Sequence, residues 1–187
     1  MKQRCRWAEC GSLQLKAYHD EEWGKPIRGD RELFELLILE SFHTGLSWQI
    51  VLHKREAFRS AMDHFDPNLI ANYDAAKVDS LMQNPQLIRH RGKIQAAIIN
   101  ARSFLAIQQE YGSFLAFIQT VLPQEVVKLQ DIPQATTVWS DELARKLKQK
   151  GMRFLGSVTV EAFLEAAGFL DGHEPACFCA AQVQSQR

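Results

Sequence analysis

The feature that most constrains the fold is a helical repeat of apolar residues, which runs through most of the chain while alternating strand-like stretches are scarce. In the segment LFELLILESFHTGLSW, residues 33–48, Leu33, Leu36 and Leu37 are spaced to share one helical face. The next position of that stripe carries Glu40. An ionised carboxylate on a core face is costly to desolvate unless something compensates its charge. The sequence therefore predicts an all-α fold with one buried acid that needs a partner.

Capping and turn residues divide this pattern into helices. Asp30, Ser140 and Ser157 are placed to cap helices, and Asp66 followed by a proline is typical of a helix start. We expect helices over residues 30–42, 47–62, 66–71, from 75 onward, 92–109, 112–122, 140–150 and 157–168. The segment 123–138 is expected to be irregular. Residues 1–187 are expected to form a single domain, with about 180–187 loosely ordered.

The overall charge removes one simple argument for function. Lys and Arg together number 22, as do Asp and Glu, so a polyanionic partner must be recognised by local clusters of cations. The N-terminus lacks the apolar core of a signal peptide, and no segment has the length of a membrane span. We therefore expect a cytoplasmic protein without a membrane partner. In that compartment, cysteines are more often metal ligands or free thiols than disulfides.

Both ends of the chain carry cysteine and histidine. Two thiolates and two imidazoles are a common ligand set for zinc, and the residues available for it are Cys5, His19, His173 and Cys177. Such a site would join the two termini, and with no open position the zinc would be structural. Cys10 and Cys179 are alternative ligands that spacing does not exclude. The other interpretation is free buried thiols and surface histidines.

The segment LARKLKQKGMRFLGSVTVEAFLEAAG, residues 143–168, is typical of two helices joined by a glycine-bounded turn. Glycine lets backbone approach a phosphate, and a helix N-terminus offers free N–H groups. We expect the phosphates of a polyanionic partner to be contacted by Lys150, Gly151, Arg153, Gly156 and Ser157. The alternative is that these cations are solvated residues at a helix end, where they are favoured in any case.

Aromatic residues are dense near Glu40, namely Trp7, Tyr18, Trp23 and Trp48. A pocket that combines aromatic faces with a carboxylate suits a flat, positively charged ring. The alternative is that the tryptophans fill the core and that Glu40 accepts from a backbone N–H or a lysine.

Several motifs together resemble the 3-methyladenine DNA glycosylase I family, a part of the helix-hairpin-helix DNA glycosylases. They are C-x-W at Cys5, AYHDEEWG at 17–24, LESFHTGLSW at 39–48, IRHRGKIQA at 88–96, GMRFLGSVT at 151–159 and the terminal H-x3-C. The resemblance extends from Cys5 to about Cys179, so it covers nearly the whole chain.

This resemblance implies a helix-hairpin-helix bundle in which a structural zinc joins the N- and C-terminal segments. It selects as zinc ligands Cys5, His19, His173 and Cys177. It also implies that Glu40 contacts the excised base and Trp48 stacks on it, while Tyr18, Trp7 and Trp23 shape the pocket. The implied reaction is hydrolysis of the N-glycosidic bond of 3-methyladenine in alkylated double-stranded DNA. The enzyme would be a monofunctional, monomeric base-excision repair glycosylase that flips the base out of the duplex.

The chain departs from the family pattern at Leu15, where a tyrosine is frequent, at His43, where glutamine is common, and at Thr44, where alanine is common. A protonated His43 would repel a cationic base, so base preference or rate is expected to differ from the typical member. A second hypothesis is therefore a catalytically impaired protein that binds or senses alkylated DNA. A third is a zinc hydrolase unrelated to DNA, which would need an open position on the metal.

Overall fold

The computed structural model describes residues 2–129 and 135–180, and within them the chain is mostly helical. The elements are α1 (Arg6–Glu9), α2 (Leu13–Glu21), α3 (Asp30–His43), α4 (Trp48–Ala61), the short 3-10 helix η1 (Asp63–Phe65), α5 (Pro67–Ile70), α6 (Ala75–Gln83), α7 (Arg91–Tyr111), α8 (Phe114–Ile118), β1 (Val127–Lys128), α9 (Val138–Gln149), α10 (Ser157–Ala166) and β2 (Leu170–Asp171). The predicted all-α class is confirmed. The segment predicted to be loosely ordered lies, apart from residue 180, outside the described residues.

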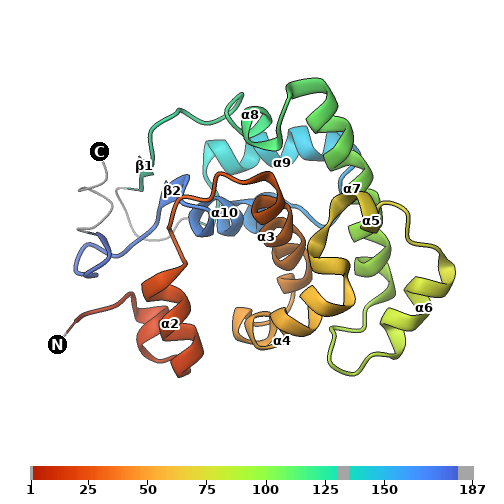
Figure 1. Cartoon of the computed structure of the whole chain (residues 1–187). Coiled ribbons are helices and arrows are strands. Elements are labelled where there is room, and N and C mark those ends of the chain that lie inside the picture. The colour runs from red at the N-terminus through yellow and green to blue at the C-terminus, as the bar shows by residue number, and fades with distance from the viewer. Residues whose placement is uncertain (1, 130–134, 181–187) are drawn as a thin grey trace.

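Helix α3 is the central element, and Figure 1 shows it between α4 and α10. It packs against α4, α7, α8 and α10, so nearly its whole circumference is covered. From Leu33 to Phe42, every residue except Glu35 is buried. A helix surrounded in this way carries apolar residues on all sides of its sequence pattern instead of on one face.

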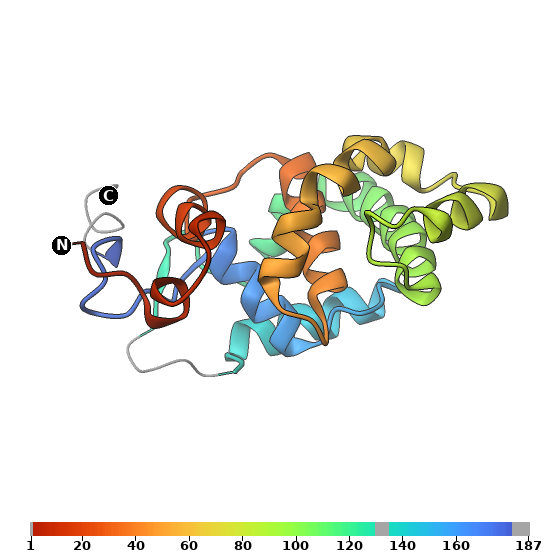
Figure 2. The same ribbon diagram turned by 90° about the horizontal axis from the view of Figure 1, so that it is seen from below.

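The two ends of the described chain meet at one end of the molecule. Figure 2 shows the N-terminal segment and the last described residues next to each other, far from α6. The backbone N–H of Phe178 donates to the carbonyl of Gln3 at 2.9 Å, which ties the segments directly. Helices α1 and α2 lie here, and sequence patterns did not predict them, since α1 has only four residues.

One strand of a short parallel pair, β1, lies in the segment 123–138 that was expected to be irregular. Strand β1 pairs with β2 in the register Val127 to Leu170 and Lys128 to Asp171. The expectation of irregular structure was wrong here, because two residues are too few to display an alternating pattern. Residues 130–134, also in that segment, lie outside the described part of the chain. Among the described residues no helix is long and apolar enough to cross a membrane.

Two predicted helix caps are corrected by the structure. Asp30 is the first residue of α3 rather than its cap, and its carboxylate instead accepts the backbone N–H groups of Phe114 (2.8 Å) and Leu115 (3.1 Å) at the start of α8. Ser140 is the third residue of α9, which begins earlier because Thr137 caps it and Ser140 completes a reciprocal capping box.

The Asp30 contacts generate a prediction about stability. Asp30→Ala should lower the free energy of unfolding by about 1–2 kcal/mol, because two N–H groups of α8 lose their acceptor. Urea denaturation measures this. Asp79→Ala is the matched control, since Asp79 is paired with Arg91 at an exposed position and its loss should cost under about 0.5 kcal/mol. Equal stability of the two variants would contradict the capping role.

Candidate functional site

Glu40 occupies the buried face of α3 and is 3% exposed. The one side chain that the structure places in hydrogen-bonding contact with it, among the described residues, is His43, whose Nδ1 lies 3.1 Å from Oε2. The alternative interpretation required a lysine or a backbone N–H as the partner of this carboxylate, and the described part of the chain supplies neither. Burial raises the pKa of Glu40, and the contact with His43 opposes that rise. Glu40 therefore keeps acceptor capacity for a further group.

Glu40 opens into a cavity of about 160 Å³. Its lining consists of Trp7, Tyr18, Trp23, Glu40, His43, Trp48, Ala162 and Glu165. All five residues predicted to contact a base are thus brought together, although they come from α1, α2, α3, α4 and the turn after α2.

The aromatic rings form two contacting pairs around the cavity. The ring centroids of Tyr18 and Trp48 are 5.5 Å apart, and those of Trp7 and Trp23 are 5.1 Å apart in an edge-to-face arrangement. Such pairs hold each other's orientation. Burial, followed by the charge of Glu40, raises the pKa of Tyr18 well above its usual value, so its hydroxyl stays protonated.

A second carboxyl of this cavity was missed by sequence reasoning. Glu165 lies on α10, and burial raises its pKa to about 7, with further contributions from Glu161, Glu40 and Asp171. The signal that singled out Glu40 was also present here. Glu161 and Glu165 are four residues apart in an otherwise apolar helix, so both were candidates for buried acids.

A buried lysine holds the turn between α3 and α4. Lys93 is 5% exposed, and its Nζ donates to the carbonyl oxygens of Phe42 (2.9 Å) and Thr44 (2.6 Å). A cation at a helix C-terminus satisfies carbonyls that lack partners in the helix. Burial lowers the pKa of Lys93. Sequence patterns gave no sign of this contact, which joins residues about fifty positions apart.

The three departures from the family pattern have different surroundings. Leu15 is buried against Gly11 and does not line the cavity. Thr44 is exposed and supplies its carbonyl oxygen to Lys93. His43 alone faces the cavity, where its ring also lies edge-on to Trp48 with centroids 5.4 Å apart.

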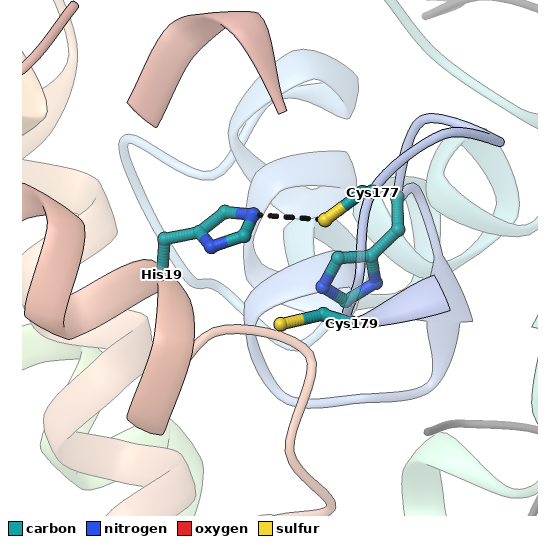
Figure 3. A group of neighbouring side chains, drawn as sticks. His19, Cys177 and Cys179 are labelled. Atoms are coloured by element: carbon teal, nitrogen blue, oxygen red, sulfur yellow. Dashed lines mark hydrogen bonds between the residues drawn. The ribbon is translucent and has the colours of Figure 1, made fainter. Parts of the chain in front are cut away.

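A group of cysteine and histidine side chains lies where the chain ends meet. The ligand atoms of His19, His173, Cys177 and Cys179 are within 4.8 Å of one another, and all four residues are buried. Figure 3 shows His19 from α2 pointing toward the cysteines of the C-terminal segment. Its Nε2 is 3.5 Å from the Sγ of Cys177.

Three of the four predicted zinc ligands belong to this group, and Cys5 lies beside it. Cys5 is fully buried, its Sγ accepts the N–H of Glu174 at 3.4 Å, and burial raises the pKa of its thiol to about 12, with a smaller contribution from Cys177. Cys179, which spacing had left open as an alternative, takes the fourth place in the group. Cys10 is exposed and outside it.

The chemistry of the group suits a metal ion. Asp20 Oδ1 is 2.9 Å from Nδ1 of His19, and Asp171 Oδ1 is 2.8 Å from Nδ1 of His173. These carboxylates hold the Nδ1 protons, which leaves Nε2 of each ring unprotonated and able to coordinate a metal. Nε2 of His173 is buried and has no hydrogen-bond partner among the described residues. Two imidazoles with thiols are the donors that zinc prefers.

The turn between α9 and α10 is held by Asn100 of α7. Asn100 accepts the N–H of Arg153 at 2.8 Å and donates to its carbonyl at 3.0 Å. Gly151 ends α9 with φ +89°, a conformation that favours glycine. The predicted cap at Ser157 was wrong by one residue: Ser157 is the first residue of α10, and the cap is Gly156, which offers no side chain. The first N–H groups of α10 therefore have no side-chain cap.

The two predicted cations of this turn differ. Lys150 is paired with Glu110, at 2.5 Å between Nζ and Oε2. Arg153 is exposed, and its guanidinium makes no ion pair or hydrogen bond with the described residues. The turn thus presents one available cation next to uncapped N–H groups.

Comparison with known proteins places this arrangement in a family. The family described as methyladenine glycosylase matches residues 7–180. DNA-3-methyladenine glycosylase 1 of Escherichia coli is 39% identical over 182 residues, which cover 95% of this chain and 96% of that protein. The DNA-3-methyladenine glycosylase of Haemophilus influenzae is 40% identical over 184 residues, which cover 96% and 98%.

Solved structures agree with the sequence comparison. A crystal structure of 3-methyladenine DNA glycosylase I matches with a TM-score of 0.90 and 41% identity, over 95% of this chain and 99% of that chain. The enzyme from Staphylococcus aureus, in a structure on its recognition of 3-methyladenine, matches with a TM-score of 0.89 and 37% identity, over 94% and 95%. The chain therefore belongs to the methyladenine glycosylase family.

Proposed function

We propose that this protein hydrolyses the N-glycosidic bond of 3-methyladenine in alkylated double-stranded DNA, as the first step of base-excision repair. The observation that carries the proposal is Glu40, a buried carboxylate that opens into an aromatic cavity and whose one described side-chain partner is His43. The names of the relatives support the same substrate. The expected monomer, single domain and cytoplasmic location stay predictions.

The chemistry follows from the charge of the substrate. Methylation at N3 makes adenine cationic within DNA, which weakens its glycosidic bond, and the base leaves as a neutral molecule. The enzyme then needs no general acid. It has to extrude the nucleotide, hold the cation between Trp48 and the other rings, and let water attack the oxocarbenium-like sugar. Glu40 supplies the negative charge that favours this cation over neutral adenine.

The cavity lining supports a monofunctional enzyme. A glycosylase with lyase activity needs an amine nucleophile, and the described lining contains no lysine. The ammonium of Lys93, the buried lysine that holds the turn between α3 and α4, donates to the carbonyls of Phe42 and Thr44 and is not available as a nucleophile. Water is therefore the proposed nucleophile.

His43 fits the proposal when it is neutral with its proton on Nδ1. It then donates to Glu40 and keeps that carboxylate ionised without adding positive charge to the cavity. The same contact favours a second candidate function. If His43 holds Glu40 away from the base, the protein would bind alkylated DNA without releasing 3-methyladenine.

Zinc is proposed as a structural ion at the cysteine and histidine group. His19, His173 and Cys177 are common to the predicted set and to the group in the structure, and Cys5 and Cys179 compete for the fourth place. Bound zinc would cross-link α2 to the C-terminal segment, as a disulfide would. It takes no part in the reaction.

The Glu40 role predicts a large loss on a nearly isosteric change. Glu40→Gln should release 3-methyladenine from methylated DNA at least about 100-fold more slowly, which corresponds to about 2.7 kcal/mol of lost stabilisation. Chromatography of the released bases measures it. Its thermal midpoint should not fall, because a buried charge is removed.

Glu32→Gln is the matched control, since Glu32 is an exposed residue of the same helix outside the cavity. It should excise normally. Undiminished excision by Glu40→Gln would remove Glu40 from the mechanism. Multiple turnover by the wild type would exclude the binding-only function.

The cations of the turn between α9 and α10 should determine how strongly DNA affinity depends on salt concentration. Replacing Lys150 and Arg153 with glutamine should weaken binding to duplex DNA and reduce the slope of log affinity against log salt by about one unit per lost phosphate contact. Fluorescence anisotropy over a salt series measures the slope. Arg145→Gln, at an exposed position where Arg145 pairs with Glu142, should leave it unchanged. An unaltered slope in the double variant would show that these two cations are solvated and contact no phosphate.

The zinc proposal predicts metal content. Purified wild type should contain one zinc per chain, and His173→Ala should contain none and unfold at a lower temperature. Atomic absorption measures the metal. Cys5→Ala and Cys179→Ala identify the fourth ligand, because only loss of a ligand lowers the zinc content. A wild type without zinc would overturn the proposal.

A further inference from the structure

The base cavity has a second acidic wall. Glu40 enters it from α3, and Glu165 enters from α10, which packs directly against α3. Glu165 is partly buried, and its carboxyl group makes no hydrogen bond or ion pair with the described residues. The ring of a bound base would lie in a space that both carboxyl groups line.

Among the described residues, no cation offsets the charge of Glu165. The ionisable groups that face Glu165 are Glu161 on its own helix, Glu40 on α3 and Asp171 on β2. Glu40 contacts His43. Asp171 contacts His173, and the charge of Lys128 also acts on it. Glu161 is 3% exposed and accepts from the N–H and the hydroxyl of Thr137. Three acids thus surround Glu165, and its own charge is left to be compensated by something else.

Because this step rests on the proposed function, the compensating group is a base in the cavity. We propose that Glu165 is a specificity-determining residue, a second carboxyl that lines the cavity and makes the pocket select cationic purines over neutral ones in a pH-dependent way. A ring with one positive charge between two carboxylates gains from both. When the glycosidic bond breaks, its electron pair stays on the base and the ring becomes neutral. The attraction of Glu165 then ends, and the acidic walls favour release of the product.

Burial and its acidic neighbours raise the pKa of Glu165 to about 7 from its ordinary value of 4.5. This shift predicts two effects of pH, one on cation binding and one on stability, and the two are opposite in sign. Well above pH 7 the carboxylate is charged and attracts a cation, and well below it the neutral acid contributes little. In the unliganded protein the effect is opposite. A carboxyl whose pKa is raised by folding stabilises the fold below its unfolded pKa, and that contribution is lost as the pH rises through the folded pKa.

Glu165→Gln tests the pH dependence of both cation binding and thermal stability in the full-length, zinc-loaded protein. The probes are the 3,9-dimethyladeninium cation, whose charge does not depend on pH, and neutral 9-methyladenine, with binding followed by tryptophan fluorescence. The ratio of wild-type to variant affinity for the cation should be near one at about pH 5.5 and rise about tenfold by about pH 8.5. Neutral 9-methyladenine should show no such rise. Dividing by the affinity of the variant cancels effects of pH on groups that the two proteins share.

The stability readout needs no ligand. The thermal midpoint of Glu165→Gln should equal that of wild type near pH 4, below the unfolded pKa, and exceed it near pH 8, where the wild type carries an uncompensated charge. Glu142→Gln, an exposed change on α9, should behave as wild type in both measurements.

The outcomes distinguish failure of the role proposed for Glu165 from failure of the proposed function. A cation preference in the wild type that loses its pH-dependent part in Glu165→Gln supports the role of Glu165. A preference that is identical in the variant at both pH values overturns that role and leaves the proposed function standing. A wild type that binds the cation no better than 9-methyladenine overturns the proposed function, and the role of Glu165 with it.

Discussion

The cost of keeping Glu40 inside the protein governs this structure. Helix α3 is covered on nearly all sides, yet it carries a carboxylate on its inner face. Such a group is tolerated only where polar contacts or a ligand compensate it. The contact with His43 provides part of this compensation, and the cavity leaves room for the rest. The turn that follows α3 is held in place by Lys93, so Glu40 and Trp48 are kept at a fixed separation.

Sequence patterns predicted much of this architecture because much of it is local. The helical repeat identified most helices, and the break in the apolar stripe identified Glu40. Capping was less predictable, since Asp30 accepts from α8, more than eighty positions along the chain. A local pattern shows that an acid precedes a helix, and it does not show which N–H groups that acid will meet. The contact of Lys93 with Phe42 and Thr44 is hidden for the same reason.

The candidate site was also predicted only in part from the sequence. The four aromatic residues were predicted from their density near Glu40, and the structure brings them around one cavity. Glu165 was missed, although its position in an apolar helix matched the argument made for Glu40. The cysteine and histidine group was predicted from residue type, but spacing does not choose between Cys5 and Cys179. That choice depends on how the C-terminal segment folds back over α2, which is a tertiary property.

The group at the chain ends also forms the rear of the aromatic wall. The ring of Trp23 lies 4.5 Å from that of His173, and the ring of Trp7 lies 5.2 Å from that of His19, measured between centroids. Both tryptophans also line the cavity. Chemical damage to the thiols would therefore reach the surface proposed to meet a base without any change in the cavity's own residues. Electrophiles that alkylate DNA also attack thiolates, so the sulfur atoms are exposed to the same reagents as DNA, and the burial of Cys5, Cys177 and Cys179 shields them.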